Sequence, residues 1–311
     1  MKEHQAREYI FEQKVMELLE SSGYVKMTGT EIAGRSGRHG INAYGTFTFP
    51  TAFVYPIRFI GQYKFYAKNK VELSHIRDFT GIMKDITESN YGTTGGNKNT
   101  PDRYTYAGCY FSATEFTRDA QEYAWAHDIF MVSFEKISVL KPQLEHIQKF
   151  VAGLNENTIN TIEREELLHG YELHCSKDDE LPNGAGAVIG IINGVYPVMI
   201  FGQKEWFYEA ISKDLAEYGD KLEVNQAYRD VNQFETYIEL DFKGIKAEFS
   251  VPNVVMEKLA YRQDNPTEGE CILKIEVAFV DDAGRKSFIE IDVNIPGYSK
   301  SEYQYEQMSL M

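Results

Sequence analysis

The sequence predicts an α/β N-terminal domain with a mixed central sheet, followed by an antiparallel α+β C-terminal domain. Strand-like and helix-periodic segments alternate over residues 54–134, an order that gives parallel strands joined by right-handed crossovers. Residues 187–296 hold three pairs of strand-like segments separated by turn residues, which is typical of antiparallel hairpins. The 311 residues are enough for two domains of ordinary size, which we place at 1–140 and 160–311.

The first domain begins with a helix over residues 3–20, because Phe11, Val15, Leu18 and Leu19 share one helical face. Further elements are expected, in order, as a strand at 24–27, a loop rich in Gly, Arg and Ser up to 40, strands at 41–49 and 54–66, a helix at 72–86, a mobile loop at 90–103, a strand at 104–114, a helix at 115–128 and a strand at 129–134. The strand-helix-strand steps predict the parallel part of the sheet.

The second domain contains a strong hairpin signal at Asn193-Gly194, which separates two apolar segments. Asn-Gly supplies the positive φ angles that a tight hairpin turn needs. Two more hairpins are expected over residues 235–252 and 271–296, with helices at 204–218 and near 253–262.

Charge is distributed unevenly along the chain. The formal net charge of −15 by itself disfavours a polyanionic partner through long-range repulsion. Residues 1–150 nevertheless hold 18 Lys and Arg against 17 Asp and Glu, so the acidity lies in residues 151–311. Within residues 21–77, eight basic side chains stand against only Glu31 and Glu72. This basic segment is either a surface for a phosphate backbone or a solvated charged face.

Cysteine and hydropathy patterns favour a soluble cytoplasmic protein with no membrane association. Cys109, Cys175 and Cys271 are far apart and form no CxxC pair, so we expect them to be reduced and structural. No apolar run approaches the roughly 18 residues of a membrane span. Four histidines lack the spacing of a zinc site: His127, His146, His169 and His174.

Lys64 lies inside a predicted strand, two residues after Gln62. The period of two in a strand places both side chains on one face. The structural alternative is a lysine that extends from the strand end into solvent. Asn42 lies on the preceding predicted strand, after the Gly-rich basic loop. If the two strands pair as a hairpin, residue 42 comes beside residues 62 and 64.

The order of these features resembles the Mrr-like branch of the restriction-endonuclease, or PD-(D/E)XK, superfamily over roughly residues 5–135. The shared features are a helix containing Phe11-Glu12, a Gly-Tyr strand, a Gly-rich turn ending in Ile41-Asn42, and Gln62-x-Lys64 followed by an aromatic residue. Residues 106–117 (YAGCYFSATEFT), followed by Ala120 and Ala124, are similar to a strand and helix entry of that family. Each motif is short, and their order and spacing carry the resemblance.

The resemblance implies a Mg²⁺-dependent or Mn²⁺-dependent phosphodiesterase that acts on DNA. In the family the metal is held by an aspartate on the first hairpin strand and by the residue at the position of Gln62. Lys64 would then orient or activate the attacking water. A divalent cation neutralises phosphoryl charge and lowers the pKa of bound water, and a nearby ammonium stabilises the charge that develops.

Asn42 departs from the family pattern, because it stands at the aspartate position. With Gln62 as the second ligand, the pair supplies amide oxygens and no carboxylate. Glu12, near the apolar edge of the first helix, is the expected nearby acidic residue. Three explanations stay open: a replacement made to trap an inactive protein, a natural pseudo-nuclease that binds DNA without cutting it, and a carboxylate displaced to another position.

Several polar residues are candidate DNA contacts, and each has an ordinary structural alternative. The basic residues and the loop histidine suit phosphate contacts but are also common on exposed surfaces. The hydroxyl residues could lie near the scissile phosphate or cap the next helix. The candidates are Arg35, Arg38, His39, Lys68, Lys70, Ser112 and Thr114.

The sequence thus predicts a metal-dependent DNA endonuclease, and the resemblance associates it with prokaryotic restriction or anti-phage defence. The alternative is a non-catalytic DNA-binding or scaffold subunit with the same fold. A third possibility is that the acidic C-terminal domain senses a small molecule or phage protein. Homo-oligomerisation or a defence-system partner protein is expected, since cutting two strands takes two active sites.

Overall fold

The structure is a computed structural model of the chain. It describes residues 1–22, 24–26, 31–41, 43–47, 55–89, 104–175, 184–203, 221–223, 226–231, 233–242, 245–261, 270–280 and 286–296. The chain divides into two compact units. The first unit contains Met1–Glu135 and Leu140–Leu181, and the second contains Lys136–Val139 and Pro182–Met311.

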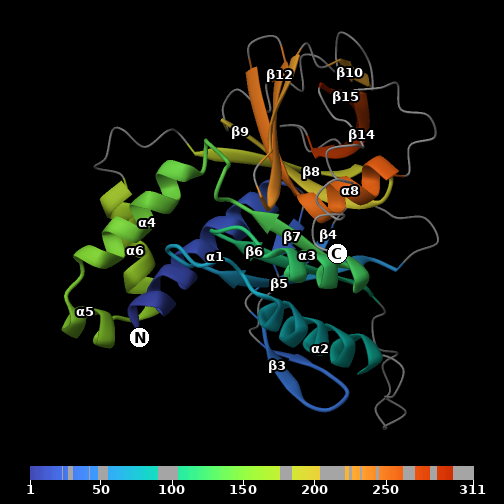
Figure 1. Ribbon diagram of the computed structural model, residues 1–311. Coiled ribbons are helices and arrows are strands. Elements are labelled where there is room, and N and C mark those ends of the chain that lie inside the picture. The colour runs from blue at the N-terminus through green and yellow to red at the C-terminus, as the bar shows by residue number, and fades with distance from the viewer. Residues whose placement is uncertain are drawn as a thin grey trace, which may run out of the picture. The chain divides into compact units, whose positions relative to one another are not determined.

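A five-stranded mixed sheet forms the centre of the first unit (Figure 1). Its strands, in spatial order, are β1 (Tyr24–Lys26), β4 (Ala43–Phe47), β5 (Ile57–Lys64), β6 (Thr105–Ser112) and β7 (Ile129–Ser133). β1, β4 and β5 pair antiparallel, whereas β5, β6 and β7 pair parallel. The prediction of a mixed sheet is confirmed. The prediction that the strands expected at 41–49 and 54–66 pair is also confirmed, since β4 and β5 are neighbours.

Helices cover both faces of this sheet. Successive side chains of β5 point to opposite faces, and buried residues occur on both, so each face needs a cover. On one face, Tyr63 packs edge-on against Phe11 of α1 (Glu3–Ser21) and donates a hydrogen bond to Met16 Sδ. On the other face, Ile60 belongs to a buried cluster with residues of α2 (Leu73–Ser89) and α3 (Arg118–Ala126). β5 therefore lies in the middle of the domain, with apolar side chains in both directions.

The helix expected at residues 115–128 begins later, at Arg118. Thr117 is its N-cap and accepts a hydrogen bond from the amide of Ala120. Phe116 forms a parallel bridge with Val71, whose amide donates to Glu115 O. This bridge holds residues 115–117 in an extended conformation, so the helix starts after them.

The segment expected as a loop up to Gly40 contains a short hairpin of β2 (Glu31–Ala33) and β3 (Arg38–Gly40). The two strands pair antiparallel and are separate from the central sheet. Strands of three residues are too short to show an alternating pattern, so they could not be predicted from periodicity.

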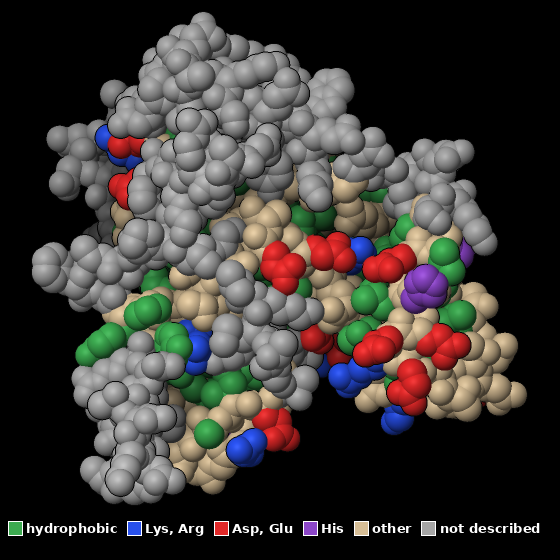
Figure 2. Space-filling model, turned by 180° about the vertical axis from the view of Figure 1, so that it is seen from behind, with side chains coloured by type: hydrophobic (Ala, Val, Ile, Leu, Met, Phe, Trp, Pro, Cys, Tyr) green, Lys and Arg blue, Asp and Glu red, His purple; other side chains and the backbone are tan. Residues whose placement is uncertain are grey.

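Three more helices lie in the first unit: α4 (Lys141–Gly153), α5 (Glu156–Thr161) and α6 (Arg164–Cys175). α4 and α6 pack with α1, and the N-terminal ammonium of Met1 donates to Ile159 O of α5 at 2.8 Å. Residues 160–175, which the sequence analysis assigned to the second domain, thus lie in the first unit. The exposed acidic side chains of these helices and their connections are Glu145, Glu156, Glu163, Glu165, Glu166 and Glu172. Figure 2 shows acidic side chains gathered over this helical part.

The second unit is built on an eight-stranded sheet, which contains the three expected hairpins. In spatial order its strands are β10 (Lys221–Glu223), β15 (Lys286–Pro296), β14 (Glu270–Val280), β8 (Ala185–Ile192), β9 (Tyr196–Gln203), β13 (Ile245–Pro252), β12 (Glu235–Phe242) and β11 (Gln226–Val231). All described neighbours pair antiparallel except β10 and β15, which differ from the expectation by pairing parallel. β11 at one edge also lies close to β15 near the other, so the sheet curls.

The β8–β9 turn has the predicted geometry, with φ of 50° at Asn193 and 67° at Gly194. α8 (Asn253–Tyr261) is the predicted second helix and packs on β12 and β13. The helix expected at 204–218 and the loop expected at 90–103 lie outside the described residues. None of the helices in the described part of the chain is both long and apolar enough to cross a membrane.

Candidate functional site

Lys64 is the last residue of β5 and pairs with Ser112 of β6. Gln62 lies two residues earlier on the same face, opposite Tyr110, and both side chains are half-buried. The Lys64 ammonium donates to Glu8 Oε1 of α1 at 3.0 Å. The side chains of Lys64 and Glu8 are only 24% and 18% exposed. The end of β5 therefore carries an ion pair that is partly shielded from water.

Glu8, which the sequence analysis did not single out, is the α1 carboxylate in contact with Lys64. Glu12 follows one helical turn later on the same face of α1, and it is also half-buried. Burial is the main cause that raises the pKa of Tyr63, the residue before Lys64, and the charge of Glu12 raises it further. The i, i+4 spacing puts Glu8 on the helical face of the predicted Glu12, so it could have added Glu8 as a candidate without showing which of the two contacts Lys64. A metal-binding role for Glu12 stays a prediction.

Asn42 lies outside the described residues, so its approach to Gln62 and Lys64 stays a prediction. The nearest described strand pair joins Ala43, the next residue along the chain, to Gly61. Ile41, on the other side, is 5% exposed and belongs to the cluster beneath α2 and α3. Ile41 is thus held by the core, and the backbone of Ala43 is held by the central sheet.

Ser112 and Thr114 are buried at the end of β6 and bond within the protein. The amide of Thr114 donates to Ser112 Oγ at 3.1 Å, and the Thr114 hydroxyl donates to Asn69 O at 2.8 Å. Neither residue caps a helix, since Thr117 is the N-cap of α3. These bonds give both hydroxyls a structural role at the edge where Lys64 lies, and a DNA contact stays a prediction.

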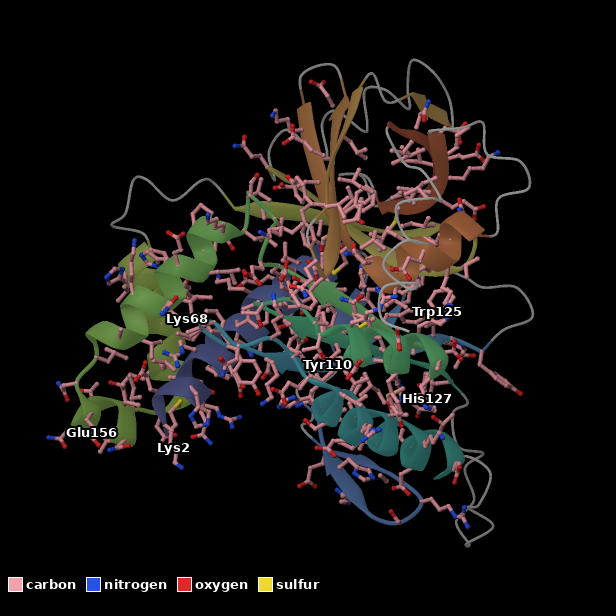
Figure 3. The ribbon with its side chains drawn as sticks, in the orientation of Figure 1. Lys2, Lys68, Tyr110, Trp125, His127 and Glu156 are labelled. Atoms are coloured by element: carbon pink, nitrogen blue, oxygen red, sulfur yellow. The ribbon has the colours of Figure 1, made fainter. Side chains whose placement is uncertain are left out.

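Lys68 and Lys70 lie on the segment between β5 and α2, where Figure 3 labels Lys68. The Lys70 ammonium bonds Glu115, whose side chain is only 5% exposed. Lys68 is exposed. Of the two predicted phosphate contacts, Lys68 is therefore the one that faces solvent, whereas the charge of Lys70 is balanced by a buried carboxylate.

Tyr66 and His75 form a polar pair at the same end of β5, which the sequence analysis did not single out. The Tyr66 hydroxyl lies 2.8 Å from His75 Nε2. Burial raises the pKa of Tyr66; the Lys64 charge lowers it, and the charges of Glu8 and Glu72 raise it. The Tyr66 hydroxyl is thus within the electrostatic reach of the Lys64–Glu8 pair.

Arg35, Arg38 and His39 lie on the β2–β3 hairpin, which is fixed to α2 by polar contacts. His39 Nε2 lies 2.6 Å from Asp85 Oδ2, and the Ser36 amide donates to Asp85 Oδ1 at 3.0 Å. The hydrogen bond with His39 is the main cause that lowers the pKa of Asp85. Each arginine is exposed and pairs with a glutamate, Arg35 with Glu88 and Arg38 with Glu31.

Among the described residues, no group of three or more His, Cys, Asp and Glu side chains has the arrangement of a metal site. The structure does bring together two histidines that are 28 residues apart, with His174 Nδ1 3.0 Å from His146 Nε2. Cys109 and Cys175 are free cysteines, as expected, and burial raises the pKa of the Cys109 thiol to about 12. The side chain of Cys271 lies outside the described residues.

Comparisons with known proteins identify the region that contains this site. Residues 4–140 match a family model described as restriction endonuclease. No curated protein matches the chain. A crystal structure of a protein of unknown function is similar at 13% sequence identity and a TM-score of 0.33, covering 55% of this chain and 99% of the other. The resemblance read from the Gln62-x-Lys64 segment and its surroundings is therefore confirmed at the level of the family.

Proposed function

On the match of residues 4–140 to the restriction endonuclease family model, we propose that the protein is a Mg²⁺-dependent DNA endonuclease of a prokaryotic restriction or anti-phage defence system. The observation that carries the proposal is the ion pair of Lys64 with Glu8, beside Gln62, at the end of the central strand β5. A partly buried ion pair adds little to the free energy of unfolding. Stability alone therefore does not explain why a lysine occupies this position in the central strand.

The residues at this end of β5 are suited to a hard divalent cation. The Gln62 amide oxygen and the Glu8 carboxylate are described oxygen donors near Lys64, and Asn42 and Glu12 are the further proposed ones. Mg²⁺ or Mn²⁺ bound there would supply positive charge to the phosphoryl oxygens and lower the pKa of a bound water. Lys64 would orient that water and offset the negative charge that develops on the phosphate.

A second candidate function is a pseudo-nuclease that binds DNA, or acts as the scaffold of a defence complex, without cutting. The observation in its favour is that Asn42 and Gln62 are both amides, so the two ligands of the family pattern bring no negative charge. The carboxylate of Glu8 is in addition balanced by Lys64. Metal affinity of the unaltered chain should then be weak.

The test is cleavage of labelled DNA by Asn42→Asp protein with Mg²⁺ and with Mn²⁺. We expect Asn42→Asp to raise cleavage, and addition of Lys64→Ala to reduce it by a factor of about 100 or more, as for loss of a group that acts on the attacking water. Lys84→Ala, an exposed lysine of α2, is the matched control and should leave cleavage unchanged.

Metal binding measured by calorimetry separates the two candidates. An endonuclease site predicts that Asn42→Asp binds Mg²⁺ more tightly than the unaltered chain does. Absence of cleavage by Asn42→Asp, alone and combined with Gln62→Glu, together with DNA binding, would leave the pseudo-nuclease. For the second unit we propose regulation, self-association or partner recognition, which light scattering and pull-down with the defence-system proteins would test.

A further inference from the structure

Tyr66 and His75 meet at the edge of the sheet that carries Lys64. Tyr66 is two residues beyond Lys64, and His75 is in the first turn of α2. Their hydrogen bond measures 2.8 Å, and their rings are 5.8 Å apart at an interplanar angle of 65°. Both side chains are half-buried, and Tyr66 packs against the cluster beneath α2 and α3. The hydroxyl is therefore held in place close to the end of β5 that carries the Lys64–Glu8 pair.

The surroundings of His75 indicate which partner donates in this bond. His75 Nδ1 is buried and has no hydrogen-bond partner among the described residues. If Nδ1 carried the proton, a buried N–H would be left unsatisfied, which is rarer and more costly than an unsatisfied acceptor. The tautomer protonated at Nε2 is thus favoured, and Nε2 donates to the Tyr66 oxygen. The Tyr66 hydroxyl then keeps its own proton for another acceptor.

We propose that the Tyr66 hydroxyl donates a hydrogen bond to a phosphodiester oxygen of DNA bound beside Lys64, and that His75 is the positioning residue that orients this hydroxyl. The inference rests on the proposed nuclease or DNA-binding function and adds a contact to it. A phosphate oxygen is an acceptor without protons, so it matches a hydroxyl whose lone pair is already occupied. The exposed Lys68 on the same segment adds positive charge for the neighbouring backbone.

The structural alternative is that the Tyr66–His75 hydrogen bond only links α2 to the end of β5. The two readings differ in whether Tyr66→Phe lowers DNA affinity, and the salt dependence then separates a hydroxyl contact from a contact by a charged group. A neutral hydroxyl contact releases no counterion, so Tyr66→Phe should lower affinity at every salt concentration and leave the salt slope unchanged. Lys68→Ala, by contrast, should reduce the slope by about one.

The experiment is fluorescence anisotropy with a fluorescein-labelled duplex in EDTA, so that cleavage plays no part. We expect Tyr66→Phe to weaken binding about tenfold, the usual size for one lost hydrogen bond to a charged group. Tyr55→Phe, an exposed tyrosine before the other end of β5, is the matched control and should bind like the unaltered chain. His75→Ala should also weaken binding, and His75→Gln should restore it, because the glutamine amide can donate in place of Nε2.

Each outcome bears on the proposal. Equal binding by Tyr66→Phe and the unaltered chain would overturn the Tyr66 contact and leave the nuclease proposal intact. A further loss when His75→Ala is added to Tyr66→Phe would overturn the positioning role, since a residue that acts through Tyr66 has no effect without it. Absence of DNA binding by both the unaltered chain and Asn42→Asp would overturn the proposed function and this inference with it.

Discussion

Two places in the first unit carry the basic residues that the sequence marked for phosphate binding, and they are built differently. At the end of β5, Lys64 is half-buried and paired with Glu8 from α1. On the β2–β3 hairpin, Arg35 and Arg38 are exposed, with side-chain exposures of 71% and 73%, and pair with exposed glutamates. A shielded pair has a defined geometry, whereas exposed pairs are screened by water and salt.

The packing behind Lys64 also differs from the packing that holds the β2–β3 hairpin. Behind Lys64, Phe11 of α1 packs edge-on against Tyr63, Phe65 and Phe134 at 5.3 to 6.2 Å between ring centres. The hairpin is held by polar contacts with Asp85 and by the half-buried Ile32, which packs against the cluster beneath α2 and α3. A rigid apolar support suits a site that must hold a reacting group in place, and a polar attachment suits a surface that adapts to a duplex backbone.

The largest effect is expected from removing the aromatic support. Phe11 is 2% exposed, so Phe11→Ala should lower the free energy of unfolding by about 3–5 kcal/mol, the usual range for a buried phenylalanine. Ile32→Ala in the hairpin, where the side chain is only half-buried, should lower it by about 1–2 kcal/mol. Urea unfolding followed by circular dichroism measures both. Equal losses would contradict the difference in support.

The next largest effect concerns which carboxylate of α1, Glu8 or Glu12, contributes to metal binding and cleavage at the end of β5. In an Asn42→Asp background, Glu8→Gln should weaken Mg²⁺ binding and slow cleavage about tenfold or more, because Glu8 contacts Lys64 directly. Glu12→Gln, one turn away on the same helix, is the variant for comparison and should have the smaller effect. Calorimetry and a cleavage assay give both quantities. A larger loss from Glu12→Gln would return the role to Glu12.

The elements that the sequence predicted well are those with a local cause. The Asn193-Gly194 turn follows from backbone preferences of two residues, and α1 follows from the spacing of its apolar positions. The Gln62-x-Lys64 segment was found because strand alternation places both side chains on one face. Each of these signals lies within a few residues of sequence.

The features that were missed depend on contacts between distant residues. Lys64 and Glu8 are 56 positions apart, and no local pattern indicates which glutamate of an amphipathic helix a strand residue will meet. The start of α3 was misplaced because the bridge between Val71 and Phe116 overrides helix preference. The strands β2 and β3 are too short to be predicted, and the attachment of their hairpin to Asp85 was missed because it spans 46 to 49 positions.

A smaller effect is expected where the hairpin meets α2. The hydrogen bond with His39 keeps the pKa of Asp85 below its usual 3.8, so ionised Asp85 stabilises the folded state. That stabilisation is present above the pKa of the unfolded chain and is lost as pH falls through the lower folded pKa. Amide hydrogen exchange of Ser36, corrected for intrinsic rates, should show protection at neutral pH that declines in acid. Asp85→Asn should remove this decline; an unchanged profile would contradict the attachment.

The smallest effects belong to the exposed arginines. Arg35→Ala and Arg38→Ala should each change the free energy of unfolding by less than about 0.5 kcal/mol, because exposed ion pairs contribute little. If they contact phosphates, each should lower DNA affinity for all sequences alike and reduce the salt slope by about one. Anisotropy titrations at several salt concentrations measure the slope, with Lys84→Ala on α2 as the control. An unchanged slope in both variants would confine phosphate binding to the Lys64 end of β5 and leave the hairpin as a solvated charged face.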